Sequence, residues 1–191
     1  MNNKYSISEF IKNIYSLLLT KIFFHQARLI RRPVYIRGKK SVSGAKGLTI
    51  GRFCRFDLDG TKKTLYIGDD CQFGDSTHIV ALNHVEIGSN VLIASKVFIS
   101  DTSHGLYKGE NADSPTLPPN DRRLVSSHVK IGDNVWIGEN VVILSGVTIG
   151  EGSIIGANSV ITKNIKKNSI VVGNNKIIKE YSNTDKTWRK A

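Results

Sequence analysis

The 191-residue sequence has few cysteines, few prolines and no long hydrophobic run. Two cysteines cannot build the dense disulfide framework of a small secreted protein, so we expect Cys54 and Cys71 to be buried core thiols. With four prolines and 17 glycines, the composition is also unlike that of a collagen-like or disordered chain. The sequence therefore predicts one cytoplasmic domain with a full hydrophobic core.

The longest apolar stretch, from Leu17 to Phe24, is interrupted by Thr20 and Lys21. It is far shorter than the roughly 20 residues that a membrane-spanning helix needs, and no signal-peptide cleavage pattern follows it. Ser6 and Glu9 form a capping-box pattern, which indicates the start of a helix. One face of that helix is apolar and comprises Ile7, Phe10, Ile11, Ile14, Leu18 and Ile22.

Charge is concentrated at the two ends of the chain. Residues 1–47 carry ten Lys or Arg against one acidic residue, and residues 163–191 carry eight against two. The segment between them carries nine against thirteen, which completes the net charge of +11. No nucleic-acid-binding motif accompanies the basic segments, so we expect no nucleic-acid partner. An amphipathic helix with a basic flank favours peripheral contact with a membrane, and a helix that caps the core is the alternative.

A hydrophobic repeat with a period of six residues dominates the second half of the sequence. Helices repeat every 3.6 residues and strands every two, so neither produces this period. A glycine follows four of the six isoleucines, and a small or β-branched residue stands four positions after each. Such a repeat predicts a three-sided solenoid of parallel strands with 18 residues per turn. The repeating residues are Ile131, Ile137, Ile143, Ile149, Ile155 and Ile161.

The repeat also runs upstream and then stops between Ile99 and Val129. Residues 102–127 contain three of the four prolines and the pair Arg122-Arg123, so we expect a loop that leaves the solenoid. Loops of this length in compact domains are usually functional. The predicted domains are a helix with a basic lead-in over 1–47, the solenoid over 48–172 and a basic tail with a short helix over 173–191. The upstream repeat comprises Ile67, Phe73, Ile79, Val85, Ile87, Ile93 and Ile99.

The run from Ile131 to Gly138, IGDNVWIG, and the run from Ile99 to Gly105, ISDTSHG, resemble the hexapeptide-repeat acyltransferases. The resemblance covers about residues 65 to 180 and is closest to the O-acetyltransferases of lipopolysaccharide and capsule assembly, relatives of the maltose and galactoside acetyltransferases. It implies a mainly β fold, a left-handed parallel β-helix, assembled as a homotrimer. It also implies acetyl-CoA as co-substrate without a metal, and a sugar hydroxyl of a bacterial surface polysaccharide as acceptor.

Transfer of an acetyl group from a thioester to a hydroxyl needs a base, and histidine suits that role in the cytoplasm. Among five histidines, His104 stands where the loop leaves the solenoid and matches the family's catalytic histidine. The family usually has proline after it, whereas this sequence has Gly105. Asp101 and Asp75 are the candidates for orienting the imidazole, and a backbone carbonyl is the alternative.

The resemblance also assigns binding residues. Gly74 and Leu82 stand where related enzymes hold the acceptor with Asn and Asp, so acceptor binding is predicted instead at Asp75, His78 and Asn83. The usual Gly-x-Pro-Ala-Lys signature of the donor site is shortened to GNNK, residues 173–176. Residues that match the family's coenzyme A contacts, or stand near them, are Trp136, Gly138, Ala157, Thr162, Lys163, Lys176 and Lys179.

Three other functions stay open at this point. A zinc enzyme on the same solenoid would need His78, His84 and His104 to converge, but the loop after His104 has no second histidine at the required spacing. An acetyltransferase acting on an antibiotic or a small free sugar would share the histidine and the co-substrate. A non-catalytic scaffold would share only the solenoid. Serine acetyltransferase is disfavoured, because residues 1–47 leave no room for its helical domain.

Overall fold

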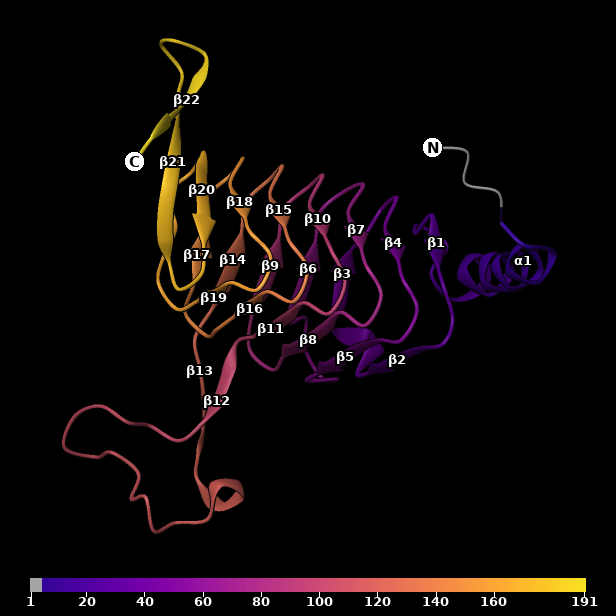
Figure 1. Ribbon diagram of the computed structural model, residues 1–191. Helices are drawn as coiled ribbons and strands as arrows, with labels where there is room; N and C mark the ends of the chain where they lie inside the picture. The colour runs from indigo at the N-terminus through magenta and orange to yellow at the C-terminus, as the bar shows by residue number, and fades with distance from the viewer. Residues whose placement is uncertain (1–4) are drawn as a thin grey trace.

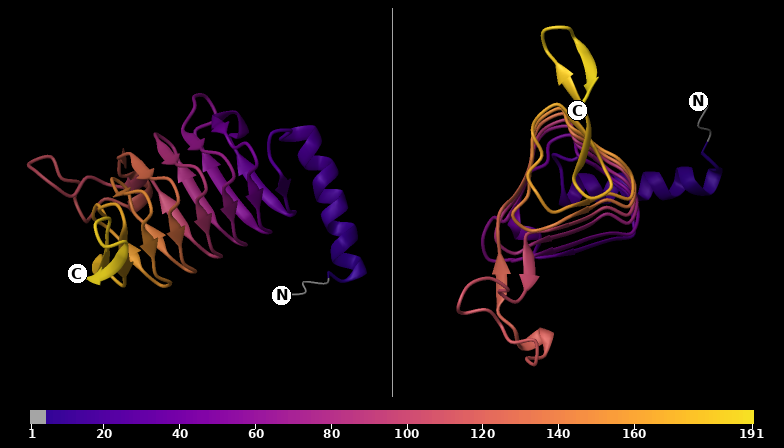
Figure 2. Two further views of the ribbon diagram at one scale, coloured as in Figure 1. Left: turned by 90° about the horizontal axis from the view of Figure 1, so that it is seen from above. Right: turned by 60° about the vertical axis from the view of Figure 1, so that its left-hand side comes forward.

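The computed structural model describes residues 5–191, which form a parallel β-solenoid of about seven turns (Figure 1). One α-helix, α1 (Ile7–Phe23), precedes the coil in this part of the chain. Figure 2 shows the triangular cross-section of the coil, from which α1, a long loop and the C-terminal strands project in different directions. The predicted three-sided solenoid is therefore confirmed.

Each side of the prism is one sheet of short strands. The nine-stranded sheet contains, in order, β1 (Leu29–Ile30), β4 (Thr49–Ile50), β7 (Gln72–Phe73), β10 (Leu92–Ile93), β15 (Trp136–Ile137), β18 (Ile154–Ile155), β20 (Ser169–Val172), β21 (Lys176–Ser182) and β22 (Thr187–Lys190). The six-stranded sheet contains β2 (Val34–Arg37), β5 (Cys54–Leu58), β8 (His78–Ala81), β11 (Phe98–Ser100), β16 (Val142–Ile143) and β19 (Val160–Ile161). The five-stranded sheet contains β3 (Val42–Gly44), β6 (Leu65–Ile67), β9 (Val85–Ile87), β14 (Val129–Ile131) and β17 (Thr148–Ile149).

The six-residue repeat sets the register between coils. Ile93 pairs with Ile137, and Ile137 with Ile155, so equivalent isoleucines stack along the axis. All three are 0% exposed, and each full burial of such a side chain contributes about 1.5–3 kcal/mol. The corners between sheets need a left-handed residue, and Asn140 and Asn158 supply it with φ of 57° and 59°. Asparagine tolerates this conformation better than most residues.

The two cysteines lie in this core, as predicted. Cys54 and Cys71 are both 0% exposed and unpaired with each other. Their thiols donate to the backbone carbonyls of Gly74 at 3.1 Å and Gly88 at 3.0 Å. Burial raises the pKa of the Cys54 thiol to about 11 and raises that of Cys71 as well. Both thiols are therefore protonated and shielded at neutral pH.

The coil begins at Leu29 and not at residue 48 as the sequence predicted. Strand β1 pairs in parallel with β4, and β2 and β3 pair in parallel with β5 and β6. The reason is a continuation of the repeat that the basic residues obscure. Ile30, Ile36, Val42 and Leu48 are spaced six apart and supply the apolar residues of one further turn.

The short C-terminal helix predicted for residues 173–191 is wrong. The segment forms strands β21 and β22, which add antiparallel to β20. Its sequence is rich in strand formers, Ile177, Ile178, Tyr181 and Trp188, and the last two rings meet edge to face at 5.4 Å. The free edge of β20 offers backbone partners that an isolated short helix would lack.

The N-terminal helix is confirmed, with both hydrogen bonds of the Ser6–Glu9 capping box formed. Its apolar face does not cap the core, however, because Phe10 is 59% exposed and Leu18 is 61% exposed. The first coil is instead approached by the turn that follows α1, where Phe24 packs against the core. None of the helical segments within residues 5–191 has the length and apolar character of a membrane span.

Candidate active site

The long loop leaves the coil where β11 would otherwise turn into the five-stranded sheet. Its stem is a two-stranded antiparallel hairpin of β12 (Thr102–His104) and β13 (Leu124–Ser126). We call the corner between the six-stranded and five-stranded sheets the loop corner; it comprises residues 82–84, 101, 144–146 and 162–164. Ser145 fixes the stem there, since its hydroxyl donates to the Asp101 carbonyl at 2.7 Å and accepts from the Ser127 N–H at 3.0 Å.

His104 is the last residue of strand β12 and lies opposite Leu124. Its side chain is exposed, and it has no hydrogen-bond partner among the residues described. An imidazole placed this way is accessible to a substrate from solvent. The histidine thus lies on β12, at the base of the projecting loop (Figure 1), and within residues 5–191 no side chain or backbone group is hydrogen-bonded to its imidazole.

The glycine after the histidine has a structural reason. Gly105 has a φ of 108°, a conformation closed to proline, and a Cβ at this position would lie 2.6 Å from the Tyr107 hydroxyl oxygen. The glycine allows the Tyr107 hydroxyl to donate to the carbonyl of His104. Arg122 donates to the same hydroxyl at 3.0 Å, so the backbone of the histidine is braced from across the loop.

A second brace spans the loop between Asp113 and Arg123. The Asp113 carboxylate accepts from the Leu106 N–H at 2.7 Å and from the Arg123 Nε at 3.1 Å. These contacts, the backbone N–H first, hold the pKa of Asp113 below its usual range. Sequence reasoning missed these bracing residues. The pair Arg122-Arg123 in a loop that also contains Asp113 and Asp121 was the available signal, but nothing in its spacing reveals which carboxylate or hydroxyl it meets.

The two carboxylates expected to orient His104 are occupied elsewhere. Asp101 is 0% exposed and accepts the backbone N–H groups of Leu82 at 3.1 Å, Asn83 at 2.7 Å and His84 at 2.8 Å. The Thr102 hydroxyl donates to it as well, at 2.6 Å. Asp101 therefore fastens the loop corner of one coil to the next.

Asp75 plays a similar part at another corner. Its carboxylate accepts the backbone N–H of Arg52 at 2.7 Å. That corner joins the nine-stranded and six-stranded sheets, at the opposite ends of the strands that run to the loop corner. Neither Asp75 nor Asp101 is hydrogen-bonded to His104 in residues 5–191.

The predicted acceptor residues do not converge. His78 lies on the outer face of the six-stranded sheet, where its Nε2 is 3.0 Å from an Asp57 carboxylate oxygen. Arg55, the main cause, holds the pKa of Asp57 below its usual range, with a smaller contribution from His78. Asn83 lies at the loop corner, and Asp75 lies at the far end of strand β8. Only Asn83 shares a corner with the root of the loop.

The predicted coenzyme A residues fall into two groups. Gly138 and Ala157 are stacked at the corner between the nine-stranded and six-stranded sheets, and a Cβ on Gly138 would lie 2.6 Å from the Ala157 nitrogen. Glycine is therefore needed for the coils to approach there. Trp136, one position before Ile137, is 49% exposed on the outer wall. Its register partners are Leu92 and Ile154.

The second group lies on the last coil, where Thr162 and Lys163 occupy the loop corner. The backbone N–H groups of Thr162 and Lys163 both donate to the Asn175 side chain, at 2.8 Å and 3.2 Å. Strand β21 then runs back along β20, where Lys176 pairs with Val172 and Lys179 with Ile170, so these two residues lie on the nine-stranded side of the last coil. All three lysine side chains are exposed. Exposed ammonium groups on the last coil suit the phosphates of a nucleotide.

The remaining histidines take part in surface contacts. His84 stacks between Tyr66 and His128, with ring centroids 4.9 Å and 4.6 Å away, and His25 lies exposed after α1. Within residues 5–191, no set of three or more His, Cys, Asp or Glu side chains is arranged to hold a metal ion. His78, bonded to Asp57, and His84, stacked between these rings, do not form such a set with His104.

The comparisons with known proteins agree with this architecture. The family of bacterial transferase hexapeptides (six repeats) matches residues 128–163. WbbJ of Escherichia coli (strain K12), which carries the name of a lipopolysaccharide biosynthesis O-acetyl transferase, is 42% identical over 190 residues, 98% of this chain and 96% of WbbJ.

Solved structures share the fold. AntD, an N-acyltransferase from Bacillus cereus in complex with dTDP-4-amino-4,6-dideoxyglucose and coenzyme A, aligns with a TM-score of 0.71 at 24% identity over 97% of this chain and 94% of AntD. The hexapeptide-repeat acetyltransferase VCA0836 from Vibrio cholerae aligns with a TM-score of 0.56 at 26% identity over 73% of this chain and 74% of VCA0836. With 42% identity to WbbJ over nearly its whole length, the chain belongs to the hexapeptide-repeat family of bacterial acetyltransferases.

Proposed function

We propose that this protein transfers an acetyl group from acetyl-CoA to a sugar hydroxyl of lipopolysaccharide or a related bacterial surface polysaccharide. The observation that carries the proposal is an exposed His104 at the root of a braced loop, in a chain 42% identical to a lipopolysaccharide O-acetyl transferase. The structural relative AntD, bound to a nucleotide sugar and coenzyme A, supports a sugar as the class of acceptor.

In the proposed reaction His104 is the general base. Its imidazole takes the proton of the sugar hydroxyl while the hydroxyl oxygen attacks the thioester carbonyl. The new C–O bond forms, the C–S bond breaks, and the proton passes from His104 to the departing thiolate. A positioned base contributes about 10²–10⁴-fold to such a step. No acyl-enzyme on cysteine is needed, and the buried, protonated Cys54 and Cys71 are unsuited to form one.

The residues of the donor site fit a nucleotide thioester. Exposed Lys163, Lys176 and Lys179 supply positive charge for phosphates at the last coil, and the exposed Trp136 offers an aromatic surface. Gly138 and Ala157 themselves carry no bulky side chain that would block an extended arm. We assign these residues, with Thr162, to binding of acetyl-CoA as co-substrate. Asn83, at the loop corner, is the best placed of the predicted acceptor residues, and Asp75 and His78 are the weaker candidates.

We further propose that the active enzyme is a homotrimer. His104 is exposed and unpartnered in residues 5–191, so a neighbouring subunit is needed to enclose the reacting groups. The test is subunit mixing. His104→Ala and Ala157→Trp, each inactive alone, should regain part of the activity when their subunits exchange. No recovery after proven exchange would place the whole site within one chain.

The proposed place of action is the cytoplasmic side of the inner membrane, with a peripheral membrane contact through the N-terminal segment. Glycan precursors are assembled there, next to the cytoplasmic supply of acetyl-CoA.

The function is tested with the purified protein, acetyl-CoA and a lipopolysaccharide fraction. We expect release of free coenzyme A thiol and a glycan mass increased by one acetyl group in place of a hydrogen, both absent with His104→Ala. Parallel reactions with free sugars and with aminoglycosides cover the two small-molecule alternatives. Transfer to those acceptors alone would overturn the polysaccharide assignment. Absence of turnover with every acceptor would favour a scaffold.

A further inference from the structure

Helix α1 is amphipathic in the inverse sense, because its polar side faces the protein and its apolar side faces solvent. Ser16 and Thr20 are 3% and 0% exposed, and they are the buried residues of the helix. Soluble proteins normally bury the apolar stripe of a surface helix. The apolar side chains that are at least 42% exposed in α1 are Ile7, Phe10, Ile11, Ile14, Tyr15, Leu17, Leu18, Ile22 and Phe23.

The inward polar side has a definite task. The Ile30 N–H donates to the Thr20 hydroxyl at 2.9 Å, and the Arg32 N–H donates to the Ser16 hydroxyl at 3.2 Å. These donors belong to β1 and its continuation, at the free edge of the nine-stranded sheet, where unpaired N–H groups invite unwanted strand pairing. The helix is therefore fixed by its hydroxyl groups as a cover for the sheet edge. With that orientation set, its apolar side must face outward.

The surface beside α1 is basic. Of the Lys and Arg side chains in residues 5–47, Arg28 and Arg37 are the ones that form ion pairs within the described chain, with Asp70 and Asp57. Lys39 lies over the rings of Phe23 and Phe24, with its ammonium 5.2 Å and 4.4 Å from their centroids. The cations without an acidic partner in this part of the chain include Arg31, Arg32, Lys39 and Lys40.

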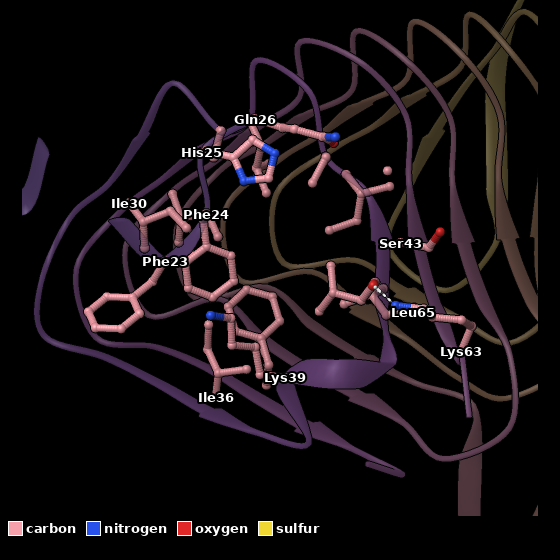
Figure 3. Close-up of a pocket in the computed structure, with 18 residues that line it drawn as sticks. Phe23, Phe24, His25, Gln26, Ile30, Ile36, Lys39, Ser43, Lys63 and Leu65 are labelled. Carbon is pink, nitrogen blue, oxygen red and sulfur yellow. Dashed lines mark hydrogen bonds between the residues drawn. The ribbon is translucent and has the colours of Figure 1, made fainter. Parts of the chain in front are cut away.

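An apolar cavity opens at the same end of the coil. Figure 3 shows it between Phe24 and Ile30 on one side and Leu65 on the other, with Lys39 and Lys63 nearby. Its volume is about 390 Å³, and no acidic residue is among the side chains that line it. A water molecule occupies roughly 30 Å³ of liquid volume, and a methylene group is of similar size, so the cavity has room for on the order of a dozen such groups. The cavity thus has the size of one hydrocarbon chain and lies beside unpaired cations.

The exposed apolar face of α1 could be covered by a second copy of the chain or by a lipid bilayer, and charge favours the bilayer. A second copy would bring the same excess of basic residues, ten against one in residues 1–47, and would repel the first. A bilayer with anionic headgroups complements that charge, and each Lys or Arg near it strengthens binding about fivefold. A helix with a large apolar face and cationic flanks lies in the plane of such an interface.

We infer that α1 and the adjoining open end of the coil dock on an anionic lipid bilayer. The outward side chains of α1 lie among the acyl chains, the basic residues meet phosphate headgroups, and the cavity receives one hydrocarbon chain of a phosphate-bearing lipid. This inference rests on the membrane contact in the proposed function and names the surface that makes it. It is tested without acetyl donor or acceptor, so its failure leaves the transferase proposal intact.

The first experiment is vesicle flotation of the full chain. Wild type should float with vesicles of phosphatidylcholine and phosphatidylglycerol, should not float with phosphatidylcholine alone, and should be released as salt rises. Leu18→Glu should weaken binding at least about tenfold, because a leucine is exchanged for a charge at the acyl-chain level. The matched control is Leu92→Glu, a 46% exposed leucine on β10 far from α1, which should bind as wild type does.

The second experiment probes the cavity with dodecyl phosphate below its micelle concentration. We expect it to raise the melting temperature of the wild type, whereas inorganic phosphate should not. Lys39→Gln should weaken vesicle binding about fivefold and reduce the shift, with Lys108→Gln, a loop lysine, as the control. An equal shift with inorganic phosphate, or none with dodecyl phosphate, would overturn chain binding in the cavity.

Two results would overturn the docking surface itself. One is equal flotation of wild type and Leu18→Glu, both folded by their melting curves. The other is a wild type that ignores anionic vesicles and whose oligomer dissociates in Leu18→Glu, which would identify a second copy of the chain as the occupant of the apolar face.

Discussion

The wall of the solenoid and the loop that leaves it are built on opposite principles. In the wall, Ile137 pairs with equivalent residues one coil above and one coil below, so the same packing recurs at every six-residue repeat. The loop has no such rule and is held by individual contacts such as Asp113 with Arg123 and Arg122 with Tyr107. The repeated part supplies rigidity, and the irregular part carries His104, the proposed general base.

The largest effect is expected in the wall. Ile137→Ala should lower the free energy of unfolding by about 2–5 kcal/mol, because a fully buried isoleucine leaves a cavity that the stacked coils cannot close. Urea unfolding measures the change. The exposed Leu92→Ala on the same sheet should stay within about 0.5 kcal/mol of wild type. Equal losses for the two variants would contradict the stacking that distinguishes wall from surface.

Substitution at the junction between wall and loop should cause an intermediate loss of stability. Asp101→Asn should destabilise the protein by about 1–3 kcal/mol, since an amide cannot satisfy all three backbone N–H groups and the hydroxyl that the carboxylate accepts. Asp75→Asn, which affects one N–H donor, should cost less. If Asp101 instead oriented His104, the variant would lose kcat with an unchanged melting curve.

Loss of a bracing contact within the loop should change the order of the loop but not the stability of the coil. Asp113→Asn should speed proteolytic cleavage between residues 105 and 123 while leaving the melting temperature of the coil unchanged. The pKa of Asp113 is held low by the Leu106 N–H and by Arg123, so its contribution to loop order is present above the ordinary carboxyl pKa of about 4. That contribution is lost as the pH falls through the lowered value. Resistance of Asp113→Asn to protease would show that the brace is not needed.

The smallest effect is expected at the two cysteines, which should not react with a thiol reagent in the native protein. Burial raises the pKa of Cys54 to about 11 and raises that of Cys71, so a thiol reagent at pH 8 should label neither while the coil is intact. Both should react at once in denaturant. Rapid labelling of the native protein would mean that the wall opens at those coils.

The six-residue period made the wall predictable, because each buried residue there packs against the equivalent residues one turn above and below. It also ran through Ile30, Ile36, Val42 and Leu48, but Arg31, Arg32 and Pro33 between them made that segment look like a lead-in. The C-terminal tail was misjudged for a different reason. Whether residues 173–191 become helix or strand is decided by the free edge of β20, a partner that the local sequence does not contain.

At the candidate site, the position of His104 followed from the place where the repeat stops. Its surroundings did not, because the two candidate carboxylates, Asp101 and Asp75, bond to backbone groups of neighbouring coils. Such contacts join residues about twenty apart, and the sequence offers several equivalent candidates at that distance. The role of Gly105 likewise became clear only from its φ of 108° and the approach of Tyr107.

The most direct test of the account is His104→Ala, assayed for acetyl transfer to a lipopolysaccharide fraction beside a melting curve and a coenzyme A titration. We predict a loss of about 10²–10⁴-fold in kcat, with the melting temperature and coenzyme A affinity unchanged, because the imidazole is exposed and forms no hydrogen bond within residues 5–191. Full activity in the variant would contradict the assignment of the base, and a parallel loss of stability would make His104 a structural residue of the loop.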